Sequence, residues 1–293
     1  MTLIGDFLDI HASAIWGPRV DQTQQHLDDC KSKIEMFLAF DDNHKKHLSE
    51  ISPRSIMEFG QYLRAERGVV ENTVNHYKAA ISKLYAYAEE YGAIGKRVMP
   101  RIKFKPIKTP APHFYSPEQI KQIQEYLGGC RHVWMLHMFN IALATGMRRG
   151  EIWRVRRDDV VWIEGQMYVH LAHTKNGFAR DVPISVEAKR AFDSVNWSFP
   201  TTRGGKFPEG AHRAAWKEIR RVICKGKKMA NFHASRHTAA SVLSNGMQTN
   251  LALVSELLGH KDMATTKKYI HVEYSNMSSI AQRLSSITVG SQS

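Results

Sequence analysis

The sequence predicts a mainly helical protein with one small β-sheet, divided into an N-terminal helical bundle and a C-terminal α+β domain. Three observations predict this fold class. Apolar residues of the first hundred positions recur at helical spacing, a basic segment rich in proline follows near residue 100, and a strong β-hairpin signal lies in the second half. The 293 residues, 43% of them hydrophobic, are enough for two packed domains.

The clearest N-terminal helix lies in residues 73–94. One apolar stripe at intervals of three and four comprises Val74, Tyr77, Ile81, Leu84 and Ala88. Asn72 or Thr73 is expected to cap the start of this helix, and Gly92 to end it. A second helix is expected after Ser52, with Pro53 at its first position. Residues 32–42 predict a third helix and residues 1–15 a short fourth, which together make a small bundle.

The clearest domain boundary is the segment MPRIKFKPIKTPAPHFYS, residues 99–116. Its four prolines interrupt both helix and sheet, and the interleaved Lys and Arg favour an extended, solvated chain. The sequence therefore predicts a helical domain over 1–98, a linker over 99–113 and a second domain over 114–293. An ordered loop inside a single domain is the alternative.

The second domain begins with predicted helices over 116–128 and 131–145. Three β-prone runs follow, at Val160–Ile163, Met167–Ala172 and Ala179–Ile184. The middle run alternates apolar and polar residues, as one buried face requires, and Asn176-Gly177 before the third run is a strong hairpin signal. Helices dominate again from residue 185.

The net charge of +13 is concentrated in the second part of the chain. Residues 1–105 hold 15 Lys and Arg against 14 Asp and Glu, whereas residues 106–293 hold 26 against 14. Such an excess favours a polyanion such as DNA as partner, because phosphate neutralisation releases condensed counterions. A basic surface that serves only solubility is the alternative.

Other features narrow the class of protein. Three widely spaced cysteines without metal-site spacing indicate reduced thiols and make zinc improbable. The N-terminus has no basic region before an apolar one, and no apolar run is long enough to span a bilayer. We therefore expect a cytoplasmic protein that does not act at a membrane. No P-loop and no paired carboxylates suited to two metals are present, so we expect no cofactor.

The residues that carry chemistry occur in a fixed order. TGMRRGE contains Arg148, HTKNGFARDVPIS contains Lys175, and the last third reads NFHASRHTAASVLSNG, SELLGH and TTKKYIHV. Arg148 follows a helix that Gly146 should end. Arg236 stands three residues after His233, so on a helix the side chains of His233 and Arg236 project from one face. Arginine gives paired hydrogen bonds to phosphate oxygens. His233 titrates near neutral pH and can accept a proton or contact the phosphate.

This ordered set resembles the catalytic domain of the tyrosine recombinases, the family of phage integrases and Xer- and Cre-type enzymes. The resemblance implies six catalytic residues: Arg148, Lys175, His233, Arg236, His260 and Tyr269. The family pattern TG-x-R-x-x-E assigns the catalytic arginine to Arg148 and leaves Arg149, its local competitor, at a variable position. Glu151 would orient Arg148 from behind, with a simple helix-face pair as the alternative.

The resemblance assigns the remaining roles. Through LGH-x8-Y-x-H it makes Tyr269 the nucleophile, and it makes Lys175 on the hairpin the general acid for the leaving 5′-oxygen. His260 would donate to a phosphate oxygen, and His271 is assigned structural support. The N-terminal bundle resembles, loosely and mainly over 50–95, the SAM-like core-binding domain of the same family.

The function implied is site-specific recombination through a 3′-phosphotyrosyl link and a four-way Holliday junction. The partners implied are double-stranded DNA with a specific core site and a homotetramer on two such sites; an accessory DNA-bending protein is also compatible. The predicted bundle begins almost at residue 1, so we expect no arm-binding domain. A type IB topoisomerase and a catalytically inactive DNA-binding regulator are the alternatives.

Overall fold

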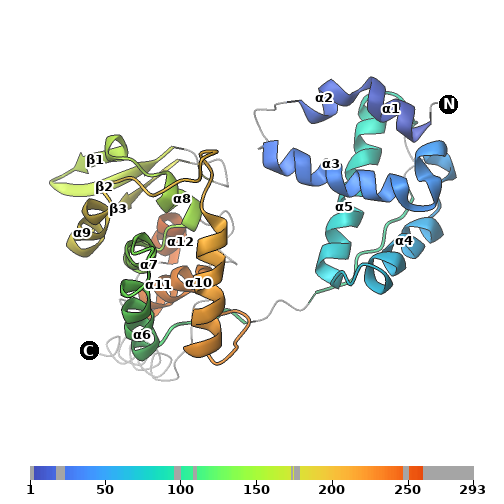
Figure 1. Cartoon of the computed structure of the whole chain (residues 1–293). Coiled ribbons are helices and arrows are strands. Elements are labelled where there is room, and N and C mark those ends of the chain that lie inside the picture. The colour runs from blue at the N-terminus through green and yellow to red at the C-terminus, as the bar shows by residue number, and fades with distance from the viewer. Residues whose placement is uncertain are drawn as a thin grey trace, which may run out of the picture. The chain divides into compact units, whose positions relative to one another are not determined.

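The computed structural model describes residues 3–17, 24–95, 100–107, 111–172, 174, 179–246 and 251–259. The chain forms two compact units, Met1–Thr109 and Pro110–Ser293 (Figure 1). Helices dominate the described part of both units, and the second also carries a three-stranded sheet. The predicted fold class is therefore confirmed.

The first unit is the predicted helical bundle. Its α-helices are α1 (Ile4–Ile10), α2 (Ala12–Trp16), α3 (Gln24–Ala39), α4 (Pro53–Ala65) and α5 (Glu71–Glu90). Two short 3-10 helices, Phe40–Lys45 and Leu48–Glu50, join α3 to α4. The helix α3 packs along α5, and their apolar stripes meet in one core around Phe37, Phe59 and Ile81. This burial stabilises helices that would be marginal alone.

The two predicted N-caps of this unit have different outcomes. Ser52 caps α4 as predicted, since its hydroxyl accepts a hydrogen bond from the amide of Ser55 at 3.1 Å, and Pro53 opens the helix. The prediction that Asn72 or Thr73 caps α5 is wrong, because α5 begins at Glu71 without a side-chain cap. The Glu71 carboxylate accepts a 3.1 Å hydrogen bond from Arg64 of α4, and this tertiary contact anchors the first turn.

Part of the proline-rich segment is held by the first unit. The side chain of Asn75 donates to the carbonyl of Lys105 at 2.8 Å, and the ammonium of Lys78 donates to the carbonyl of Lys103 at 2.9 Å. Both donors lie on α5. Residues 100–107 therefore run along this helix, although the sequence assigns them to a linker.

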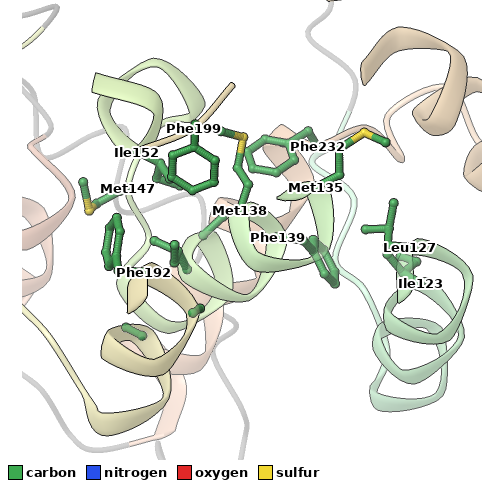
Figure 2. Packing of buried hydrophobic residues seen from close by; sticks show 14 of the residues in the cluster. Ile123, Leu127, Met135, Met138, Phe139, Met147, Ile152, Phe192, Phe199 and Phe232 are labelled. Atoms are coloured by element: carbon green, nitrogen blue, oxygen red, sulfur yellow. The ribbon is translucent and has the colours of Figure 1, made fainter. Parts of the chain in front are cut away.

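The second unit surrounds an almost wholly apolar helix. Its elements are α6 (Pro117–Gly128), α7 (Trp134–Thr145), α8 (Arg149–Arg154), β1 (Val160–Ile163), β2 (Gln166–Leu171), β3 (Arg180–Pro183), α9 (Val186–Ser194), α10 (Glu209–Val222), α11 (His233–Gly246) and α12 (Leu251–Leu258). The helix α7 packs against α6, α8, α9 and α11, as a helix apolar on every side requires. Figure 2 shows Phe139 of α7 facing Ile123 and Leu127 of α6, with Phe192 of α9 in the same cluster.

The small sheet has the order β1-β2-β3, with both pairs antiparallel. Val169 of β2 and Val182 of β3 are paired and fully buried, so one face of the sheet packs on the core. The three predicted strands are confirmed to within one or two residues. The pairing of Leu171 with Arg180 is the last before the connection, which shows that β2 and β3 flank the predicted hairpin. Its turn, Asn176-Gly177, lies outside the described residues.

Candidate active site

Arg148 is placed by a tight turn between α7 and α8. The helix α7 ends at Thr145, and Gly146 follows in the left-handed conformation with φ 66°. A side chain at this glycine would come within 2.7 Å of Leu258, so both the backbone conformation and the space require glycine. Arg148 then occupies the N-cap position of α8. The expected helix end before Arg148 is present.

The Glu151 carboxylate binds both the backbone amide and the guanidinium of Arg148. The backbone amide of Arg148 donates to one carboxylate oxygen of Glu151 at 2.8 Å, and its guanidinium donates to the other at 2.9 Å. Glu151 is only 3% exposed. Burial alone would raise its pKa, but hydrogen bonds from Arg180 and Arg148 outweigh burial and lower the pKa of Glu151 to about 2. Glu151 is therefore a buried carboxylate that stays ionised at neutral pH.

Arg236 reaches the same place from α11. It is 2% exposed and donates one hydrogen bond to the carbonyl of Gly146 at 2.7 Å and another to the carbonyl of Leu258. Arg148 donates to the neighbouring carbonyl of Gly259 at 3.0 Å. The two arginines, 88 positions apart in the sequence, thus converge between the end of α7 and the end of α12.

Three arginine side chains bind the end of α12. Carbonyls in the last turn of a helix lack intrahelical partners and carry partial negative charge. Here the carbonyls of residues 257, 258 and 259 accept hydrogen bonds from Arg180, Arg236 and Arg148 in turn. The next residue is His260. The described part of the chain therefore leads directly from these cations toward a predicted catalytic residue.

His233 is the first residue of α11, and its side chain is exposed. Its ring centroid lies 4.7 Å from that of His237, at an angle of 81°. Burial, followed by the charges of His233 and Arg236, lowers the pKa of His237 to about 4, so His237 is neutral at physiological pH. Sequence reasoning missed His237, although it directly follows Arg236 and stands one helical turn after His233. Arg236 is buried while His233 lies at the surface, so the two predicted residues differ in solvent access.

Arg149 is directed away from the site. Its guanidinium pairs with Glu209 at 3.0 Å and lies 4.5 Å from the ring centre of Phe207. It also contacts His212 at 3.3 Å. Burial, and second the charge of Arg149, lowers the pKa of His212 to about 3. The neighbours Arg148 and Arg149 therefore diverge, and of the two only Arg148 binds the end of α12, as Arg236 does.

Four predicted site residues lie outside the described residues: Lys175, His260, Tyr269 and His271. Their assignment stays a prediction. Among the described residues, no group of three or more His, Cys, Asp or Glu could hold a metal ion. No helix in the described ranges is both long and apolar enough to cross a membrane.

Two protein-family models match this chain. The model of the phage integrase family matches residues 113–276, and the model of the phage integrase SAM-like domain matches residues 4–105. The chain therefore belongs to the phage integrase family, the tyrosine recombinases. It is an enzyme of the tyrosine recombinase class, and the predicted resemblance is confirmed.

Individual relatives are named as recombinases. The chain is 25% identical to the shufflon-specific DNA recombinase of Escherichia coli over 77% of its own length, and it spans 55% of that protein. It is 23% identical to a tyrosine recombinase of Thermosipho africanus, covering 83% of this chain and 87% of the relative. It is 24% identical to tyrosine recombinase XerC of a Roseiflexus species, covering 84% and 83%.

Solved structures share the fold. The Tn1549 transposon integrase, solved with transposon right end DNA, superposes with a TM-score of 0.68 at 16% identity, over 97% of this chain and all of that one. The λ integrase dimer bound to a core site has a TM-score of 0.65 at 15% identity, over 93% of this chain and all of that one. At these identities the match establishes the fold alone.

Proposed function

We propose that this protein is a site-specific DNA recombinase that cuts and rejoins double-stranded DNA through a 3′-phosphotyrosyl intermediate. The convergence of Arg148 and Arg236 at the end of α12 is the observation that carries the proposal. Two guanidiniums aimed at one phosphate stabilise the charge that grows on its non-bridging oxygens during attack. Arg148 has five N–H donors, and its bonds to Glu151 and Gly259 leave donors for a phosphate.

The chemistry proposed follows from the remaining predicted residues. The phenolic oxygen of Tyr269 attacks the phosphorus, and the bond from phosphorus to the 5′-oxygen breaks. Lys175 gives a proton to that leaving oxygen, while His233 accepts the phenolic proton. His260 donates to a phosphate oxygen. The 5′-hydroxyl of a partner strand then attacks the phosphotyrosine and releases the phenol, so bond energy is conserved and no nucleotide is needed.

The proposed partners are duplex DNA with a specific core site and three further copies of the chain. The charge excess over residues 106–293 supports DNA binding. Residues 274–293 support assembly, since they carry an apolar stripe at helical spacing that comprises Met277, Ile280, Ala281, Leu284 and Ile287. We propose that this stripe docks on a neighbouring protomer, with docking on its own domain as the alternative. Strand exchange then proceeds through a Holliday junction, and we place the reaction in the cytoplasm. An accessory DNA-bending protein is compatible with this assembly.

Covalent capture tests the reaction and finds the target site in one experiment. The protein is incubated with genomic DNA fragments that carry nicks, and covalent adducts are isolated under denaturing conditions. Nuclease digestion and mass spectrometry then identify the tyrosine that carries a nucleotide, and sequencing of the captured DNA gives the site. We expect the nucleotide on Tyr269. Tyr269→Phe should form no adduct yet bind the captured DNA, because it removes one oxygen from a largely electrostatic interface.

Tyr274→Phe is the matched control, since it removes the same atom from a neighbouring tyrosine and should form the adduct normally. An adduct that survives in Tyr269→Phe would place the nucleophile elsewhere. Absence of any adduct in the unmodified protein would favour a DNA-binding regulator over a recombinase. Relaxation of supercoiled plasmids that lack the site would favour topoisomerase activity.

Deletion of residues 274–293 tests the assembly. We expect the truncated protein to bind a single site nearly as well as the full chain but to pair two sites weakly, as measured by gel shift on one-site and two-site DNA. Full recombination by the truncated protein would contradict the docking of this segment on a neighbour.

A further inference from the structure

Arg180, the first residue of β3, lies in the segment HTKNGFARDVPIS but is assigned no role there, and it has none in the proposed chemistry. Yet its side chain is only 7% exposed and every nitrogen of its guanidinium donates a hydrogen bond. Two of these bonds reach the two carboxylate oxygens of Glu151, at 3.1 and 2.8 Å. The third runs from Nε to the carbonyl of Leu257 at 3.0 Å. Arginine suits this place because its planar fork can hold a carboxylate with two donors and a carbonyl with a third.

Arg180 and Arg148 share the Glu151 carboxylate. Each carboxylate oxygen accepts one bond from each arginine: Oε1 from the two guanidiniums, and Oε2 from the Arg148 backbone amide and the Arg180 guanidinium. A buried carboxylate with its acceptor sites filled in this way has one defined orientation. The direction of the Arg148 guanidinium therefore depends on a group that Arg180 fixes from the opposite side.

Arg180 also joins two elements that lead to predicted catalytic residues. It pairs with Leu171 at the last register position of β2 and β3, and the connection beyond that pair contains Lys175. Its bond to Leu257 and its close approach to Gly259 attach the same residue to the end of α12, which leads to His260. A side chain at Gly259 would lie 2.8 Å from the Arg180 guanidinium, so glycine at this position makes room for it.

We propose that Arg180 is a positioning residue for DNA cleavage, which orients Arg148 through Glu151 and ties the β2–β3 hairpin to the end of α12. The inference rests on the proposed function, because its consequence is measured in the cleavage reaction. Arg180 itself acts through these neighbours and is given no contact with DNA.

The charged groups that face Glu151 in the described structure are Arg148, from the turn before its own helix, and Arg180, from β3. The helix α12 contributes backbone carbonyls beside them. Removal of Arg180 leaves Glu151 buried with one arginine in place of two. Its pKa should then rise, and its protonation would release the bond that holds Arg148. A cleavage rate that depends on pH in a new way is a consequence that a general loss of packing would not produce.

The experiment compares Arg180→Gln with Arg221→Gln. Arg221 forms a similar paired contact with Glu218 on the exposed surface of α10, so this control removes the same charge without touching Glu151. Single-turnover formation of the covalent adduct is measured from about pH 5.5 to about pH 9, together with DNA binding and the melting temperature. We expect Arg180→Gln to cleave on the order of 10- to 100-fold more slowly than the control at neutral pH, with near-equal DNA binding. We also expect a new loss of rate toward acid pH, partly recovered at high pH.

Two further variants keep the inference falsifiable. Arg180→Lys retains the charge but cannot supply three donors in one plane, so it should also cleave slowly; cleavage at the wild-type rate would overturn the inference, even where Arg180→Gln fails to fold. The double variant Glu151→Gln/Arg180→Gln should cleave less slowly than the product of the two single losses predicts, because part of the Arg180 effect passes through Glu151 and only the tie to Leu257 is lost in addition. Fully independent losses would show that Arg180 does not act through Glu151. If the unmodified protein forms no adduct, the proposed function falls and this inference with it. If the unmodified protein cleaves and Arg180→Gln matches Arg221→Gln at every pH, this inference alone is overturned.

Discussion

Both units of the chain contain an arginine–glutamate pair, and the two pairs differ in burial and in what they connect. In the first unit Arg64 contacts Glu71, with side chains 32% and 24% exposed, and Lys105 approaches the same carboxylate. In the second unit Glu151 is 2% exposed at its side chain and holds both Arg148 and Arg180. The first pair fastens one helix to another. The second orients Arg148, which binds the end of α12 beside the buried Arg236.

The difference shows where buried charge is required rather than tolerated. Taking ions out of water is costly, and a hydrophobic cluster of the same size would stabilise the fold as well or better. Buried charge at the junction of α7, α11 and α12 is therefore better explained by function than by stability. The first unit buries its polar groups mainly to hold backbone, as Asn43 does by donating to the carbonyl of Phe37.

Replacement of arginine by lysine should separate the two regions most strongly. Arg148→Lys and Arg236→Lys keep the charge but lose the paired geometry, so covalent adduct formation should fall on the order of 10²- to 10³-fold. Arg64→Lys in the first unit should change the rate by only a few fold. Single-turnover cleavage measures all three. Equal losses in the two units would mean that the junction has no special part in cleavage.

Replacement of the two glutamates by glutamine tests the same contrast in stability. Glu151→Gln leaves two arginines facing an uncharged group in a buried site and should lower the free energy of unfolding of the second unit by about 3 kcal/mol. Glu71→Gln breaks a part-exposed pair and should cost about 1 kcal/mol or less in the first unit. Hydrogen exchange, followed by mass spectrometry on peptides of each unit in the full chain, reports the two separately. A larger cost for Glu71→Gln would reverse the comparison.

The same contrast explains which features could be predicted from the sequence. Ser52-Pro53 and the β-strands around residue 169 depend on local signals, and the structure contains them as predicted. The start of α5 and the path of residues 100–107 depend on contacts between distant segments, and the sequence does not reveal them. Arg148 could be separated from Arg149 only through the family pattern, because the two side chains diverge toward distant partners, Gly259 for Arg148 and Glu209 for Arg149.

The candidate site shows the same limit. Arg148 and Arg236 stand out because arginine suits phosphate and because the motif order is specific. Arg180 and His237 do not stand out, since one is a basic residue at a strand start and the other a second histidine in a helix. Their importance arises from what they touch: a buried carboxylate, the end of α12 and the ring of His233. Periodicity and spacing carry no information on such contacts.

Two glycines with the same backbone conformation offer a smaller test. Gly92 in the first unit has φ 69° with nothing within 4 Å of an added methyl, while Gly259 has φ 62° and faces Arg180. Gly92→Ala should cost about 1 kcal/mol, from the left-handed conformation alone. Gly259→Ala should cost at least about 1 kcal/mol more, because the methyl group must displace the Arg180 guanidinium. Urea unfolding gives both values, and equal costs would show that Arg180 yields without penalty.

The smallest effect expected is a dependence of stability on pH that arises in the second unit. The pKa of His237 is lowered to about 4 and that of His212 to about 3, in both cases mainly by burial. The unfolded chain binds protons at both residues below about pH 6.5, whereas the folded chain excludes them. Stability is therefore fully present above about pH 6.5 and declines as the pH falls toward about 4.

Tryptophan fluorescence follows this decline, because five of the six tryptophans belong to the second unit. Urea midpoints at about pH 7.5, 6 and 5 should fall in that order. His237→Gln should flatten the decline, since it removes one of the two groups that resist protonation in the folded state. His132→Gln, at an exposed histidine before α7, is the control and should leave the slope unchanged. If the urea midpoint of His237→Gln fell with pH as steeply as that of the wild type, His237 would accept its proton in the folded state. Burial and the charges of His233 and Arg236 would then not hold His237 neutral.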